Sequence, residues 1–116
     1  MRLVTTTIAL VLLAGPAAAT VVKMKEERPG LLKKAKITAD AATTTAKAKV
    51  PGGKIVSAEI EEEKGKLLFS FDVKTAGKSG IDEVNVDALD GTVLSVQHET
   101  PRDEARERVT DKKKRP

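Results

Sequence analysis

Two features of this 116-residue chain carry side chains that could do chemistry: an acidic run near the middle and a single histidine. Glu59, Glu61 and Glu63 would share one face of a strand, and carboxylates arranged in that way could bind a hard cation. The alternative, which we favour, is that these charges protect an edge strand from pairing with another chain. His98 has neither a second histidine nor a cysteine to complete a metal site, so we expect an ordinary histidine at a strand end.

The other residue types leave little room for catalysis. The sequence contains no Cys, Trp or Tyr, which excludes disulfides, thiolate metal sites and cysteine nucleophiles. Serine and threonine are plentiful, but the chain has no nucleophile turn such as G-x-S-x-G. Asp87 and Asp90 flank a turn, where aspartates are favoured, rather than forming an acid pair. We therefore predict a protein that is not an enzyme, with no catalytic residue, metal or cofactor.

The first residues predict export. They have the parts of a secretory signal peptide: Arg2, an uncharged and mostly apolar stretch over 3–14, the helix-breaking pair Gly15-Pro16 and the small residues 17–19. We expect cleavage after Ala19 and a periplasmic or secreted protein. The alternative is an uncleaved membrane anchor, since residues 3–22 carry no charge. The chain then divides into four segments: a signal peptide (1–19), a charged lead-in with a short helix (20–36), a folded domain (37–99) and a disordered basic tail (100–116).

The net charge of +4 is concentrated at the ends of the chain. Residues 20–101 hold 13 basic and 13 acidic residues, whereas residues 102–116 hold 7 basic and 4 acidic residues. With no basic patch and no aromatic platform on the domain, we exclude a nucleic-acid partner. The tail is either a solvated segment, which we favour, or a weak contact with anionic envelope surfaces.

A single helix is predicted over residues 39–49. Thr38 is a good N-cap, and Pro51 with Gly52-Gly53 prevents the helix from continuing. Its inner face has small side chains, Ala42, Ala46 and Val50, which would let the helix lie close to a sheet.

After Gly53 the apolar residues alternate with a period of two, which is typical of strands. Four strands are expected over about 54–63, 66–74, 82–89 and 92–97, with Asp90-Gly91 as a two-residue hairpin turn. The residues expected to face the helix are Val56, Ala58, Ile60, Leu67, Phe69, Phe71, Val73, Val84, Val86, Ala88, Leu94 and Val96. The fold class is therefore α+β, one helix packed on a four-stranded antiparallel meander.

Several segments together resemble the PepSY domain: residues 31–38, the turn Val50-Pro51-Gly52-Gly53-Lys54-Ile55, and residues 86–94. The resemblance covers about 31–97. This chain lacks the tyrosine common on the second strand of the family, where Phe69 and Phe71 stand instead. PepSY domains occur in propeptides of secreted metallopeptidases and in small exported proteins, so the resemblance implies a modulator or inhibitor of a secreted peptidase. The alternative function is a structural or stress-related envelope protein held at anionic surfaces by its tail.

A strand edge is the expected contact for such a partner, because extended peptides add to open sheet edges. The last strand, Thr92, Val93, Leu94, Ser95, Val96 and Gln97, carries no charge, so it is the less protected edge. A domain this small, without disulfide or metal, is also typical of chains that gain stability through self-association.

Overall fold

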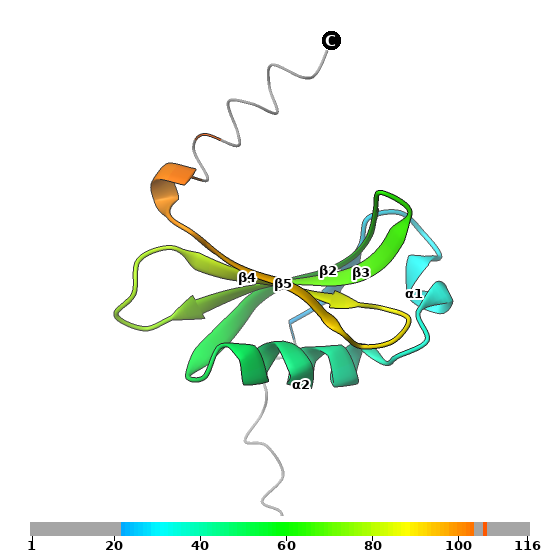
Figure 1. Ribbon diagram of the computed structural model, residues 1–116. Helices are drawn as coiled ribbons and strands as arrows, with labels where there is room; N and C mark the ends of the chain where they lie inside the picture. The colour runs from blue at the N-terminus through cyan, green and yellow to red at the C-terminus, as the bar shows by residue number, and fades with distance from the viewer. Residues whose placement is uncertain (1–21, 104–105, 107–116) are drawn as a thin grey trace, which may run out of the picture.

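The computed structural model describes residues 22–103 and 106 (Figure 1). Its elements, in chain order, are β1 (Met24–Glu26), α1 (Leu31–Lys34), α2 (Ala39–Lys49), β2 (Gly53–Glu63), β3 (Lys66–Thr75), β4 (Ile81–Asp87) and β5 (Val93–Glu99). The predicted signal peptide lies outside the described residues. In the predicted tail, residues 101–103 form a helical turn that is capped by Thr100. Beyond residue 103, Arg106 alone is among the described residues. No helix among the described residues is long and apolar enough to span a membrane.

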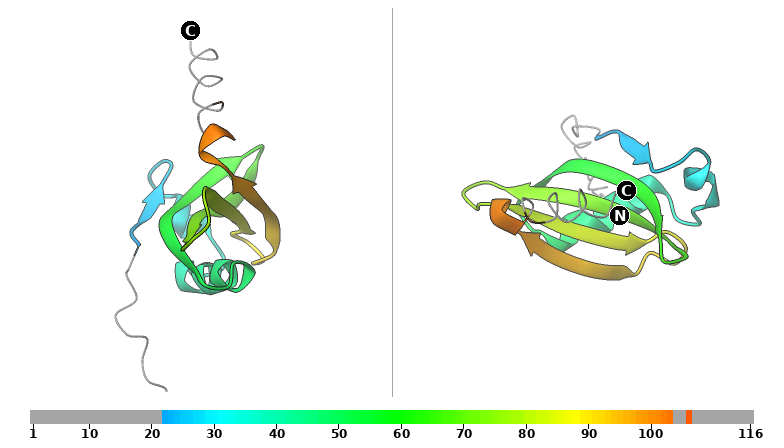
Figure 2. Two further views of the ribbon diagram at one scale, coloured as in Figure 1. Left: turned by 90° about the vertical axis from the view of Figure 1, so that its left-hand side faces the viewer. Right: turned by 90° about the horizontal axis from the view of Figure 1, so that it is seen from above.

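The strands form one twisted sheet in the order β1-β2-β3-β4-β5 (Figures 1 and 2). Strands β2 to β5 are the antiparallel meander that the sequence predicts. The prediction of four strands is wrong at the N-terminal side, because β1 adds a fifth strand parallel to β2. Three residues in a charged segment are too short to show an alternating pattern, so the sequence gives no signal for β1.

Helix α2 covers one face of this sheet and contacts β2, β3, β4 and β5 (Figure 1). As predicted, the hydroxyl of Thr38 accepts a hydrogen bond from the backbone N–H of Ala41, and the helix ends at Lys49. Ala42 and Ala46 are fully buried, which lets the helix backbone approach the strands closely.

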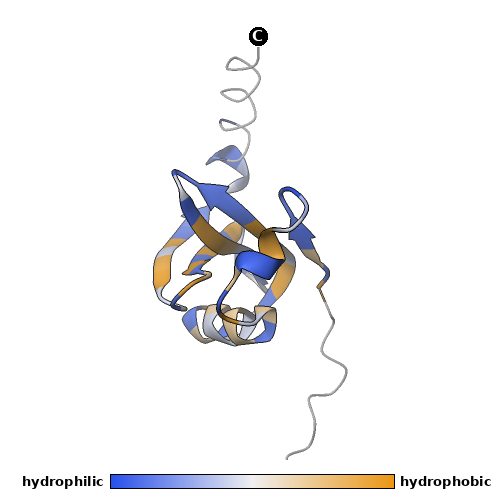
Figure 3. Cartoon of the chain, turned by 90° about the vertical axis from the view of Figure 1, so that its right-hand side faces the viewer, coloured by the Kyte–Doolittle hydropathy of each residue, from blue (hydrophilic) through white to orange (hydrophobic). Residues whose placement is uncertain are grey.

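The core lies between α2 and the sheet, where hydrophobic bands cross the strands (Figure 3). Phe69 and Phe71 are both fully buried, with ring centroids 6.3 Å apart. The other predicted inner residues that are buried are Ala58, Ile60, Leu67, Val73, Val84, Val86 and Ala88. The sequence therefore assigned the face correctly over the centre of the sheet.

The predicted face is wrong at Val56 and Leu94, and Val96 has the predicted face without being buried; all three are exposed. Val56 is the extra residue of a register shift in β2, so Ile55 and Ala58, three residues apart, both face the core. Leu94 is likewise the extra residue of a register shift in β5, because its neighbours Val93 and Ser95 pair with the consecutive residues Val86 and Asn85 of β4. Val96 lies opposite the buried Val84 but remains exposed, because no strand flanks β5 on its far side among the described residues.

Two glycines in the loop between β3 and β4 provide a test of this packing. Gly77 and Gly80 both have positive φ, of 79° and 82°, but a Cβ at Gly77 meets open space whereas one at Gly80 would overlap the carbonyl oxygen of Glu99. We expect Gly77→Ala to destabilise the fold by about 1–2 kcal/mol through backbone strain. Gly80→Ala should cost roughly 1–3 kcal/mol more, because β5 must shift. Urea unfolding of the two variants tests this, and equal costs would contradict the close approach.

Candidate functional site

The exposed side chains of β5 lie along an open edge of the sheet. β4 pairs with one side of β5, and no strand pairs with the other side within residues 22–103. Leu94 is 37% exposed and Val96 is 46% exposed. The edge therefore combines unpaired backbone groups with apolar side chains, the combination that an added strand requires.

The two faces of β5 differ. Val93 packs partly against the core opposite Val86, and Val96 lies on this same inner face. On the outer face, the hydroxyl of Ser95 accepts a hydrogen bond of 3.1 Å from the Asn85 side chain. A strand added to β5 would therefore meet an apolar inner side and a polar outer side.

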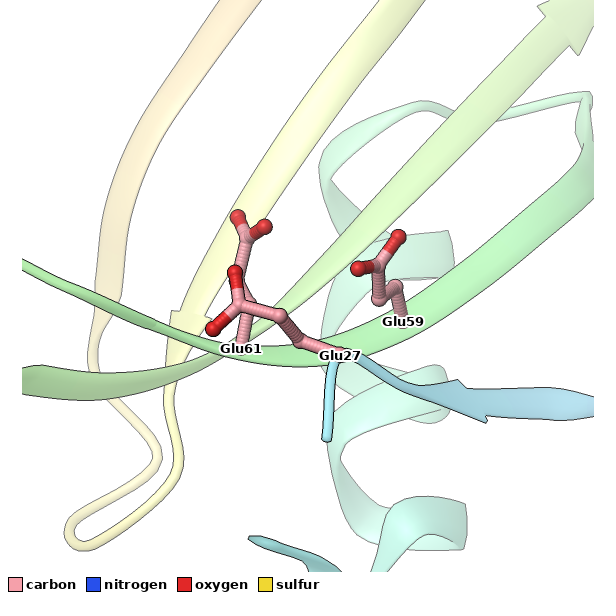
Figure 4. Close-up of side chains that lie close together, drawn as sticks. All are labelled: Glu27, Glu59 and Glu61. Carbon is pink, nitrogen blue, oxygen red and sulfur yellow. The ribbon is translucent and has the colours of Figure 1, made fainter. Parts of the chain in front are cut away.

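The prediction that the glutamates protect an edge strand is wrong, because β1 pairs with Ala58, Glu59 and Ile60 and β2 is therefore not the outermost strand. The structure instead brings Glu59 and Glu61 together with Glu27, which follows β1 (Figure 4). One carboxylate oxygen from each of the three lies within 4.8 Å of the others, and Glu63 is not part of this group. Glu27 was missed because its position depends on the parallel pairing of β1, which no local pattern reveals.

The three carboxylates, which we call the acidic cluster, repel one another. Burial raises the pKa of Glu61 to about 7, and the negative charges of Glu59, Glu63, Glu27 and Glu83 act in the same direction. Exposed acidic groups gather on many proteins without an ion, and nothing else in the described part of the chain marks this cluster as a metal site. We therefore describe it as a site of charge repulsion.

The remaining candidate residues have local partners. Nδ1 of His98 lies 2.8 Å from a carboxylate oxygen of Asp82, on the neighbouring strand. Asp87 accepts hydrogen bonds from the N–H groups of Leu89 and Asp90, and Asp90 accepts one from Thr92. The aspartates thus stabilise the turn, as predicted, although the turn runs from Asp87 to Val93 and is longer than two residues.

The comparison with family models agrees with this fold. Residues 36–97, more than half of the chain, match the model PepSY, described as the peptidase propeptide and YPEB domain. The chain belongs to the PepSY family. Comparisons with curated proteins and with solved structures found no match. The resemblance seen in the sequence is therefore confirmed.

The PepSY match includes α2, β2, β3, β4 and most of β5. The candidate edge, residues 92–97, thus lies within the family domain, whereas β1 and α1 precede it. The segment that pairs with β2 therefore lies outside the matched region.

Proposed function

We propose that this PepSY domain is a non-catalytic binding domain that restrains a secreted or periplasmic peptidase, and that β5 is its contact strand. The observation that carries the proposal is the open edge of β5, which has no charge over residues 92–97. The description of the family, which names peptidase propeptides, supports a peptidase as the partner. The domain would act in an exported protein, after removal of residues 1–19. PepSY domains typically occur in exported proteins, which supports this location.

The proposed mechanism follows from how peptidases bind substrates. A peptidase cleft holds its substrate as an extended strand, so it can pair with an open strand of another protein through backbone hydrogen bonds. Strand β5 is held by its pairing with β4 and by the contact of α2. A contact strand fixed in this way binds without the freedom to adopt the geometry of cleavage, so we expect occupation of the cleft without turnover.

Capture followed by an activity assay tests the proposal. The immobilised protein is exposed to the secreted and periplasmic fractions of its source organism, and a retained peptidase is purified. We expect this peptidase to lose activity in proportion to added PepSY protein, with the protein remaining uncut by mass spectrometry. Retention of no peptidase, or rapid cleavage of the domain, would contradict the proposal.

A further inference from the structure

Residues 22–34, which we call the strap, follow the β2 edge outside the region matched to PepSY (Figure 2). Met24, Lys25 and Glu26 pair in parallel with Ala58, Glu59 and Ile60. The pairing continues for one more bond, from the N–H of Glu27 to the carbonyl of Ile60 at 3.0 Å. The strap therefore occupies a position that a strand from another protein would otherwise fill.

Three kinds of contact hold the strap in place. Leu31 is 1% exposed and belongs to the core, and the partly buried Met24 packs against the core. Arg28 and Lys34 form ion pairs with Glu62 of β2. The hydrogen bond from the Arg28 guanidinium also lowers the pKa of Glu62, so this carboxylate stays ionised to lower pH than an isolated glutamate.

The acidic cluster opposes these contacts, because one of its members comes from the strap and two come from β2 (Figure 4). The charged groups that act most strongly on Glu61 are acidic: Glu59 and Glu63 on β2, Glu27 on the strap and Glu83 on β4. The residue opposite Glu61 on β3 is the uncharged Leu68. The next residue across the sheet is Asp87 of β4, which forms an ion pair with Lys66. Lys25 of the strap lies opposite Glu59 in the parallel register.

We propose that the strap is a detachable, pH-sensitive strand that is seated on β2 in acid and is released more often as the pH rises through neutrality. Protonation of the cluster removes the repulsion between the strap and β2. Ionisation restores it, since release separates Glu27 from the two carboxylates of β2. The raised pKa of Glu61 places this change near neutral pH. Release leaves the β2 edge without a partner, so the domain then offers two strand-binding edges instead of one.

Amide hydrogen exchange of the whole chain tests this inference without any peptidase. Protection of the peptide over residues 24–32 is compared between about pH 5 and about pH 8, after correction for intrinsic exchange rates, with EDTA present. The reference is β3, whose core residues report global unfolding. Because each unit of pKa difference between the seated and released states changes their ratio tenfold, we expect strap protection to fall roughly three- to tenfold relative to β3.

Matched variants distinguish the cluster from a general effect of charge. Glu61→Gln and Glu27→Gln are each expected to remove most of the pH dependence. Glu63 lies on β2 with Glu61 and raises the pKa of Glu61 whether or not the strap is seated, so Glu63→Gln should move the change to lower pH but keep it. Unchanged β3 protection confirms that each variant is folded. Strap protection independent of pH in the wild type, or equal flattening by Glu63→Gln, would overturn the proposal.

Discussion

Replacing Phe71 with alanine is expected to lower the free energy of unfolding by about 3–5 kcal/mol, the usual cost of removing a buried aromatic ring. Phe71 is fully buried on the inner face of β3, the strand at the centre of the sheet, and its ring lies beside that of Phe69. A domain of this size has a total stability of only about 5–10 kcal/mol, so the variant should be close to unfolding at room temperature.

Urea unfolding monitored by circular dichroism measures the effect of Phe71→Ala. Val56→Ala is the control, since Val56 is an exposed β2 residue and its truncation should change stability by at most about 0.5 kcal/mol. Phe69→Ala should cost as much as Phe71→Ala. A small cost for both single variants would show that the inner face is misassigned.

The sequence predicted the elements whose signals are local. The bounds of α2 follow from the cap at Thr38 and the proline at position 51, and both signals act within one helical turn. The alternation of apolar and polar residues from Phe69 to Val73 placed β3 and its two phenylalanines correctly, because successive residues of a strand point to opposite faces.

The errors arose where one extra residue changes the parity of a strand. Val56 and Leu94 are as apolar as the residues that face the core, so the sequence cannot mark them as the extra residues. The strap and the acidic cluster depend on the pairing of β1 with β2, between segments more than 30 residues apart. Such contacts leave no periodic pattern, and the position of Glu27 beside Glu59 and Glu61 could not be predicted.

The second large effect is expected at the open edge. Val96→Lys should weaken binding of the peptidase about tenfold or more, because the added strand would bury a charge beside the apolar inner side of β5. Val56→Lys is a closely matched control. Both valines are on strands and have nearly the same exposure, 46% and 47%, but they lie on different strands. Val96 belongs to β5, the last strand of the sheet, whereas Val56 belongs to β2, two residues before the segment that pairs with β1. Neither substitution removes a core contact, so both proteins should retain the wild-type melting temperature.

The dissociation constants of the captured peptidase for the wild type, Val96→Lys and Val56→Lys test the central claim most directly. The account predicts that Val56→Lys binds within about twofold of the wild type, and that Val96→Lys binds at least about tenfold more weakly, a difference of roughly 1.4 kcal/mol or more. Equal affinities for all three folded proteins would contradict β5 as the contact strand.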